Sequence, residues 1–265
     1  MHSLSDPARV EISREQLASQ AAAVLARLRA TQPRIHCITN SVAQNFTANA
    51  LLALGAVPSM TLSGEEIGGF VAGSNALLVN LGTFDRERRE ATAIAIDAAA
   101  QAGLPWVLDP VFVDRAAQRC AYARELMDLA PKAVRLNAAE FTALSGEPLS
   151  RDAVASYARE RKTVIGLTGE TDLIADGARA VSIANGHPLM ARVTAMGCAA
   201  SSIVAACLAA EPDSLAATSS AMLIVGVAGE MAAETAKGPG SFATAILDAL
   251  YTIDAQALTA RARIL

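Results

Sequence analysis

The chain has 265 residues, of which 52% are hydrophobic and 18% charged, and its formal net charge is −4. This composition excludes a disordered chain, and without a lysine- or arginine-rich stripe it gives no sign of nucleic acid as a partner. The mean hydropathy of +0.33 is high, yet we find no stretch that fits a membrane span of about 20 apolar residues. Because much of the apolar content is alanine, we expect alanine-rich helices that pack against other subunits.

The first part of the chain alternates between helix and strand patterns, as expected for an α/β domain. Ser13 and Gln16 form a capping-box start, and Pro58 either weakens its strand or places it at a sheet edge. In order, the predicted elements are a helix from Ser13 to before Pro33, a strand over 34–39, a helix over 42–54, strands over 57–61 and 76–81, a helix over 85–102, a strand over 106–108, a helix over 115–130, a strand over 133–136, helices over 137–146 and 150–161, and a strand over 163–167.

The pattern changes after residue 167. Asp176-Gly177 and Asn185-Gly186 lie between short β-prone runs and are typical of hairpin turns, so we predict antiparallel strands over 173–193 at one sheet edge. Helices over 198–210 and 215–236 and a last helix after Gly240 complete the chain. We therefore predict one domain over residues 1–265, a three-layer α/β/α fold whose mostly parallel central sheet has an antiparallel edge hairpin.

Ligands in such sheets bind at the carboxyl ends of the strands. The polar and sulfur-bearing residues at the predicted strand ends are therefore candidates for a site: Asn40, Ser59, Met60, Asn80, Asp109, Asn137, Glu140, Thr168 and Cys198.

Standard signatures such as GxGxxG, GxxxxGK[ST], HExxH and GxSxG are missing. Four cysteines without CxxC spacing, and an N-terminus without an apolar or basic leader, indicate a reducing, cytoplasmic location.

The turn Ala195-Met196-Gly197-Cys198 precedes an apolar helix. Free N–H groups of Met196, Gly197 and Cys198 at the helix start, together with the helix dipole, would form an anion hole for a phosphoryl group. The same residues also fit an ordinary strand-to-helix turn.

Asp109, Asn137 and Glu140 supply two carboxylates and an amide near strand ends. Such a set suits Mg²⁺, which keeps waters and substrate phosphates among its ligands. Asn137 and Glu140 equally suit a helix N-cap and first turn. Arg135 would reach a phosphate or a surface partner, and Thr168 would help to cradle a nucleotide or close a tight turn.

Together these residues resemble the hydroxyethylthiazole kinase family. The resemblance runs through HCITNSV (36–42), NFTAN (45–49), LGA (54–56), PSM (58–60), LDPV (108–111), RLNAAE (135–140), TGE (168–170), GCA (197–199) and GPGSF (238–242). Each motif is short, but their shared order over nearly the whole chain is specific.

The resemblance implies a ribokinase-like fold and a homotrimer with active sites between subunits. It implies phosphorylation of the hydroxyethyl alcohol of 4-methyl-5-(2-hydroxyethyl)thiazole by ATP and Mg²⁺, in thiamine salvage. By position it assigns substrate binding to Met60, Ala195 and Asn40, ATP binding to Arg135, Thr168 and Asn137, the metal and phosphates to Asp109 and Glu140, and the place of a sugar-kinase catalytic aspartate to Cys198.

One departure from the family pattern concerns the turn before the cysteine, where the usual run is Gly-Thr-Gly-Cys. Ala195 adds a methyl group and Met196 replaces a hydroxyl, which leaves affinity and substrate preference open.

Phosphoryl transfer depends mainly on positioning and charge stabilisation. Cys198, with a reference pKa of about 8.5, is therefore expected to be a modest base or only to orient the alcohol.

Two other functions stay open. Another small-alcohol kinase of the same fold, of the hydroxymethylpyrimidine kinase type, would take a different acceptor, but the runs at 36–40 and 137–140 favour the thiazole enzyme. A non-catalytic thiazole- or nucleotide-binding protein would bind without phosphate transfer. The joint presence of Asp109, Glu140, Arg135 and Cys198 argues against it.

Overall fold

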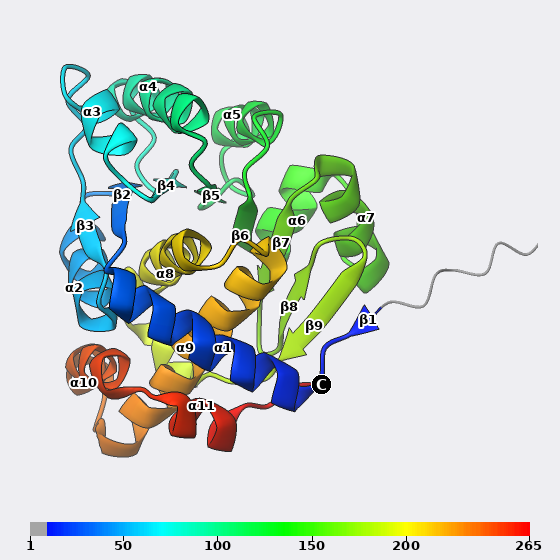
Figure 1. Ribbon diagram of the computed structural model, residues 1–265. Helices are drawn as coiled ribbons and strands as arrows, with labels where there is room; N and C mark the ends of the chain where they lie inside the picture. Colours follow the sequence, from blue (N-terminus) through cyan, green and yellow to red (C-terminus); the bar gives the residue numbers. More distant parts are fainter. Residues whose placement is uncertain (1–9) are drawn as a thin grey trace, which may run out of the picture.

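Helices cover both faces of one nine-stranded sheet in the computed structural model, which describes residues 10–265 (Figure 1). The strands are β1 Val10–Glu11, β2 Arg34–Ile38, β3 Val57–Ser59, β4 Ala76–Asn80, β5 Trp106–Asp109, β6 Ala133–Asn137, β7 Val164–Thr168, β8 Asp172–Ala175 and β9 Arg179–Ile183. The helices are α1 Arg14–Thr31, α2 Gln44–Leu54, α3 Ile67–Ala72, α4 Arg86–Ala102, α5 Ala117–Met127, α6 Ala138–Ser145, α7 Arg151–Arg161, the 3₁₀ helix η1 Pro188–Arg192, α8 Met196–Ala210, α9 Ser214–Thr235, α10 Pro239–Thr252 and α11 Ala255–Arg261.

The strand order is β1-β9-β8-β7-β6-β5-β4-β2-β3, and β8 runs antiparallel to both of its neighbours while the other pairs are parallel. The parallel register sets Asn80 beside Asp109, and Asn137 beside Thr168, at the carboxyl edge. This edge is therefore where the chain gathers its polar strand-end residues, as the strand-end rule predicts.

Each face of the sheet buries its own apolar cluster. Helices α3 to α7 cover one face, and α1, α2 and α8 to α11 cover the other (Figure 1). The interior strand β4 is buried at every position, which explains why its sequence is apolar without alternation. Burial against helices on both sides thus accounts for the high apolar content.

Helix α9 corrects the expectation that no stretch fits a membrane span. Its 22 residues are long and apolar enough to cross a membrane, with a window of mean hydropathy 1.5, but that window is 89% buried inside the fold. It packs against α1, α8 and α10, so it is a core helix of this structure.

Local sequence signals explain most element boundaries. The Ser13–Gln16 capping box begins α1, the Pro58 strand lies at the sheet edge, and Asp176-Gly177 joins β8 to β9 in an antiparallel hairpin. Asn40 Oδ1 accepts a hydrogen bond from Ala43 N at 2.9 Å, and the resulting turn delays α2 to residue 44.

Three parts of the prediction were wrong or incomplete. Asn185-Gly186 does not form a second hairpin, because η1 follows it instead of a strand. The hairpin is also not outermost, since β1 adds to β9 in parallel. Strand β1 and helix α3 were missed, and the predicted last helix is two helices, α10 and α11. The prediction that residues 1–9 carry no leader lies outside the described residues.

Candidate active site

A pocket of about 970 Å³ opens at the carboxyl ends of β5, β6 and β7, beside the start of α8. It brings together the predicted ATP-binding, anion-hole, metal and catalytic residues and one predicted substrate-binding residue: Asp109, Arg135, Asn137, Glu140, Thr168, Ala195, Met196, Gly197 and Cys198. Residues from four separate segments thus meet in one cavity.

Two predicted substrate-binding residues do not line this pocket. Asn40 lies behind it, where its amide donates to Cys198 Sγ at 3.3 Å. Met60 directly follows the edge strand β3 and packs, partly buried, against the core. A single chain therefore does not bring Met60 and Ala195 into one cavity.

The start of α8 has an unusual backbone. Ala195, the N-cap residue, has φ +68° and ψ −3°, the left-handed region that favours glycine. A Cβ on Gly197 would lie 3.3 Å from Arg135 Nη1, so glycine here lets the guanidinium approach the helix start. Of the three predicted anion-hole donors, Met196 N already donates to Val193 O at 3.4 Å, whereas Gly197 N and Cys198 N have no partner within residues 10–265 and share the pocket with this arginine.

Arg135 is a cation without a countercharge in direct contact. It forms no ion pair within residues 10–265, and its buried Nε has no hydrogen-bond partner there. A buried guanidinium nitrogen is costly without a partner. An anionic group such as a phosphate would supply one.

Asp109 is a buried carboxylate with both of its side-chain hydrogen bonds on one oxygen. Its Oδ2 accepts hydrogen bonds from Asn80 Nδ2 at 2.7 Å and Ser201 Oγ at 2.8 Å. Burial raises the pKa of the Asp109 carboxyl to about 6, although the charge of Arg135 and these two hydrogen bonds oppose the shift.

Cys198 is a protonated thiol at neutral pH. Burial, followed by the charge of Asp109, raises the pKa of the Cys198 thiol to about 11, against the hydrogen bonds from Asn40 and Asn80 and the charge of Arg135. The thiol is thus a poor base in this structure.

Asn137 and Glu140 form the reciprocal capping box that the sequence left as one alternative. Glu140 N donates to Asn137 Oδ1 at 3.0 Å, and Asn137 N donates to Glu140 Oε2 at 2.9 Å. Glu140 Oε1 also accepts from Phe112 N at 2.9 Å. Both carboxylate oxygens therefore hold backbone while the residue lines the pocket.

The carboxylates fit a magnesium ion bound mainly by phosphates and water. Among residues 10–265, no three His, Cys, Asp or Glu side chains gather into a protein-only metal site. Asp109 Oδ1 has no hydrogen-bond partner in the same range, which leaves one oxygen for a ligand. Mg²⁺ commonly takes one or two carboxylates together with substrate phosphates.

Several pocket residues escaped the sequence reasoning. Met190, Met222 and Arg263 also line the pocket, and they come from η1, α9 and the C-terminal segment. Ser201, which bonds to Asp109 without lining the pocket, was missed because it stands within the apolar run of α8. No local motif marks any of these residues, and only the tertiary fold brings them to the site.

The residue pattern over positions 25–256 matches the model of the hydroxyethylthiazole kinase family. The chain belongs to this family. It is 44% identical over 247 residues to a probable hydroxyethylthiazole kinase of Agrobacterium fabrum, covering 93% of this chain and 95% of the relative. The structure of hydroxyethylthiazole kinase from Pyrococcus horikoshii matches with a TM-score of 0.90 and 35% identity, covering 93% and 98% of the two chains.

The fold also matches beyond the family. A ribokinase-like superfamily protein from Enterococcus faecalis superposes with a TM-score of 0.69 at 13% identity, covering 94% of this chain and 98% of that one. The predicted ribokinase-like α/β fold is therefore confirmed.

Proposed function

We propose that the chain transfers the terminal phosphoryl group of ATP to the hydroxyl of hydroxyethylthiazole, a step of thiamine salvage. Family membership supports this reaction. The observation that carries it is the unpaired Arg135 guanidinium, which shares one pocket with the start of α8, Asp109 and Cys198. This arrangement supplies positive charge and N–H donors where a phosphoryl group would pass.

In the proposed mechanism, Arg135 and the N–H groups of Gly197 and Cys198 hold the transferring phosphoryl group. Asp109, assisted by Glu140, would hold Mg²⁺, which neutralises phosphate charge when bound. The protonated Cys198 thiol orients the alcohol by hydrogen bonding. A strong base is not required, because the transition state is loose and positioning dominates.

The rest of the pocket supports a nucleotide as phosphate donor. Asn137 and Thr168 stand at adjacent strand ends, near the proposed phosphate position. The pocket lining also includes the apolar side chains of Met190, Met222 and Val225, which suit the flat face of a base.

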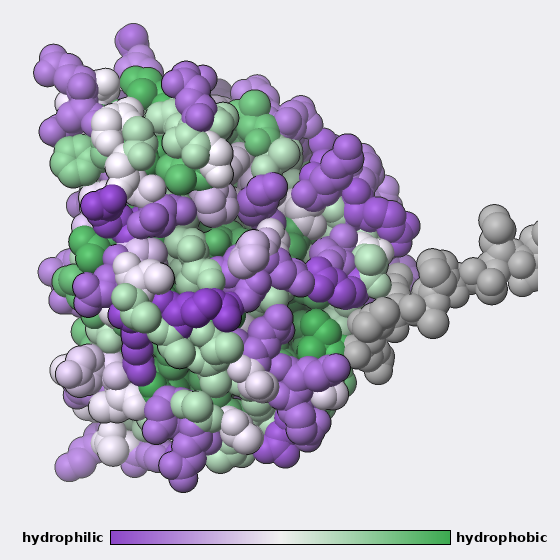
Figure 2. Space-filling model, in the orientation of Figure 1, coloured by the Kyte–Doolittle hydropathy of each residue, from purple (hydrophilic) through white to green (hydrophobic). Residues whose placement is uncertain are grey.

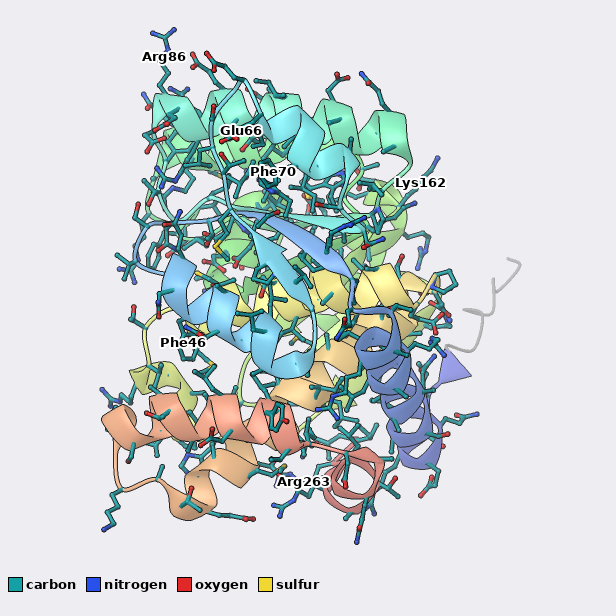
Figure 3. The ribbon with its side chains drawn as sticks, turned by 60° about the vertical axis from the view of Figure 1, so that its left-hand side comes forward. Phe46, Glu66, Phe70, Arg86, Lys162 and Arg263 are labelled. Atoms are coloured by element: carbon teal, nitrogen blue, oxygen red, sulfur yellow. The ribbon has the colours of Figure 1, made fainter. Side chains whose placement is uncertain are left out.

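The proposed assembly is a homotrimer with active sites between subunits, in the cytoplasm. Its support is the separation of Met60 from the pocket, together with exposed apolar side chains around β3. Val42 is 71% exposed and Leu52 57% exposed. Figure 2 shows hydrophobic residues at this side of the molecule, and in Figure 3 Phe46 and Phe70 lie on opposite sides of β3. All four cysteines are free thiols, as suits a reducing compartment.

The test is an assay of the purified chain with ATP, Mg²⁺ and hydroxyethylthiazole, with the product identified by mass. We expect thiazole monophosphate and ADP in equal amounts, and a much lower kcat/KM for hydroxymethylpyrimidine. Preference for the pyrimidine alcohol would move the chain to the other small-alcohol kinases. Binding of both ligands without phosphate transfer would favour a non-catalytic protein.

A further inference from the structure

Two buried side chains, Asn80 and Ser201, bond to the Asp109 carboxylate from behind, and Asn80 also bonds to the Cys198 thiol. Asn80 is 1% exposed and Ser201 is fully buried, and neither lines the pocket. They would therefore not contact a substrate bound in the pocket directly. Any role in the reaction must therefore pass through Asp109 and Cys198.

The Asn80 amide joins these two groups directly. Its Nδ2 donates to Asp109 Oδ2 at 2.7 Å and to Cys198 Sγ at 3.2 Å. Its Oδ1 accepts from Gly82 N at 3.0 Å, and this backbone donor fixes which end of the amide faces the site. The planar Asn80 amide therefore donates hydrogen bonds to both the Asp109 carboxylate and the Cys198 thiol.

The second asparagine is oriented in the same way. Asn40 Oδ1 accepts from Ala43 N at 2.9 Å, which turns Nδ2 toward Cys198 Sγ at 3.3 Å. The sulfur therefore accepts two N–H bonds, and its own S–H is left to donate elsewhere. On the carboxylate, Asn80 and Ser201 both use Oδ2, which leaves Oδ1 for a ligand.

The chain keeps space for this arrangement at Gly82. A Cβ there would lie 2.6 Å from Asn40 Nδ2 and 2.9 Å from Asn80 Oδ1. Both distances are too short for a real side chain, and hydrogen bonds hold both amides in place. Only glycine at position 82 therefore leaves room for both amides in these positions.

We propose that Asn80 and Ser201 are positioning residues for phosphoryl transfer. Asn80 ties the Asp109 carboxylate to the Cys198 thiol, and Ser201 fixes the same carboxylate oxygen, so that Oδ1 and the S–H meet the reactants in one geometry. This inference rests on the proposed function, because it assigns these residues a part in that reaction.

A matched pair of serine variants tests the proposal. Ser201→Ala removes the hydroxyl that donates to Asp109 Oδ2 at 2.8 Å and has Gly197 O as a second acceptor at 3.2 Å. Ser202→Ala removes a buried hydroxyl of the same helix whose one bond within residues 10–265 is to Ala199 O. We expect Ser201→Ala and Asn80→Ala each to lower kcat about tenfold to hundredfold, the range for a lost hydrogen bond to a charged group. KM values for ATP and the thiazole should change much less, and Ser201→Thr, which keeps the hydroxyl, should restore most of kcat.

The control variant Ser202→Ala should keep kcat within about twofold of the wild type, because its hydroxyl bonds to no residue of the proposed site. Equal losses of kcat in Ser201→Ala and Ser202→Ala would indicate a structural role and overturn the proposal. Unchanged kcat in both Ser201→Ala and Asn80→Ala would overturn it as well.

Crystal structures of the variants give a second readout that does not depend on activity. The Asp109 carboxylate should rotate away in Ser201→Ala and Asn80→Ala and stay in place in Ser202→Ala. An unmoved carboxylate in the first two variants would contradict the proposal even if the wild type phosphorylated the thiazole. A wild type without that activity would instead contradict the proposed function, and the carboxylate position would still decide the positioning role.

Discussion

Burial, followed by the charge of Asp109, keeps the Cys198 thiol protonated, although the Asn40 and Asn80 amides that donate to its sulfur lower the pKa of this thiol. We predict that Cys198→Ala lowers kcat without abolishing it, because Arg135 and the start of α8 remain to stabilise the phosphoryl group. Cys198→Asp should stay active, since it supplies an oxygen where the sulfur stood. Steady-state kinetics of both variants provide the measurement. A folded, ATP-binding Cys198→Asp protein without turnover would contradict this interpretation.

Ala195 holds a backbone conformation that costs an alanine about 1–2 kcal/mol. Ala195→Gly should therefore raise the free energy of unfolding by up to about 1 kcal/mol, after the greater freedom of glycine in the unfolded chain is subtracted. Gly103 ends α4 at φ +65°, and a Cβ added there would meet no atom within 4 Å. Gly103→Ala is thus the opposite control and should lower stability by about the same amount. Urea unfolding of the two variants measures both effects. A change of the same sign in the free energy of unfolding of both variants would refute the strain at Ala195.

The strand-end rule found Asp109, Asn137 and Thr168 because parallel strands bring their carboxyl ends to one edge whatever the rest of the chain does. It did not find Ser201, whose hydroxyl lies within an apolar helix and reaches Asp109 only through packing of α8 on the sheet. The relation of Met60 to the pocket also lay beyond the sequence, since it depends on the placement of β3.

At the scale of elements, the capping box of α6 links stability to the site. Glu140→Ala should lower the free energy of unfolding by about 1–2 kcal/mol, because Asn137 N and Phe112 N lose their acceptor. If Glu140 also serves the metal, the same variant should raise the Mg²⁺ concentration for half-maximal activity. Unfolding curves and a Mg²⁺ titration measure the two effects.

Ser150→Ala is the matched control for this prediction. Ser150 caps α7 by accepting from Ala153 N at 3.0 Å, and it does not line the pocket. Its loss should cost about 1 kcal/mol of stability and leave the Mg²⁺ titration unchanged. An unchanged titration in Glu140→Ala as well would leave Glu140 with the capping role alone.

The two turn dipeptides show how far local signals reach. Asp176-Gly177 forms its hairpin because Asp176 Oδ1 accepts from Ala178 N and Arg179 N within the turn. Asn185 instead bonds to Glu230, Arg261 O and Arg263 N, partners 45 or more residues away. Those distant contacts, followed by Pro188 at the start of η1, replace the hairpin that the dipeptide favours.

At the scale of the whole molecule, the sheet leaves its β3 edge next to exposed apolar side chains (Figure 3). Such a patch on a protein with few charges is typical of an interface between subunits. The same edge carries Met60, which the pocket of a single chain lacks. A neighbouring subunit seated there would cover the apolar residues and bring Met60 to a pocket across the interface.

We therefore predict a particle of about three times the chain mass of 27.3 kDa in sedimentation equilibrium. Leu52→Glu should dissociate it and raise KM for the thiazole more than KM for ATP, because only the acceptor site would need both subunits. Leu149→Glu is the control, since Leu149 is also exposed but precedes α7, far along the sheet from β3. It should leave both the mass and the two KM values unchanged. A wild-type monomer with full thiazole kinase activity would show instead that one chain completes the site and that Met60 has no part in it.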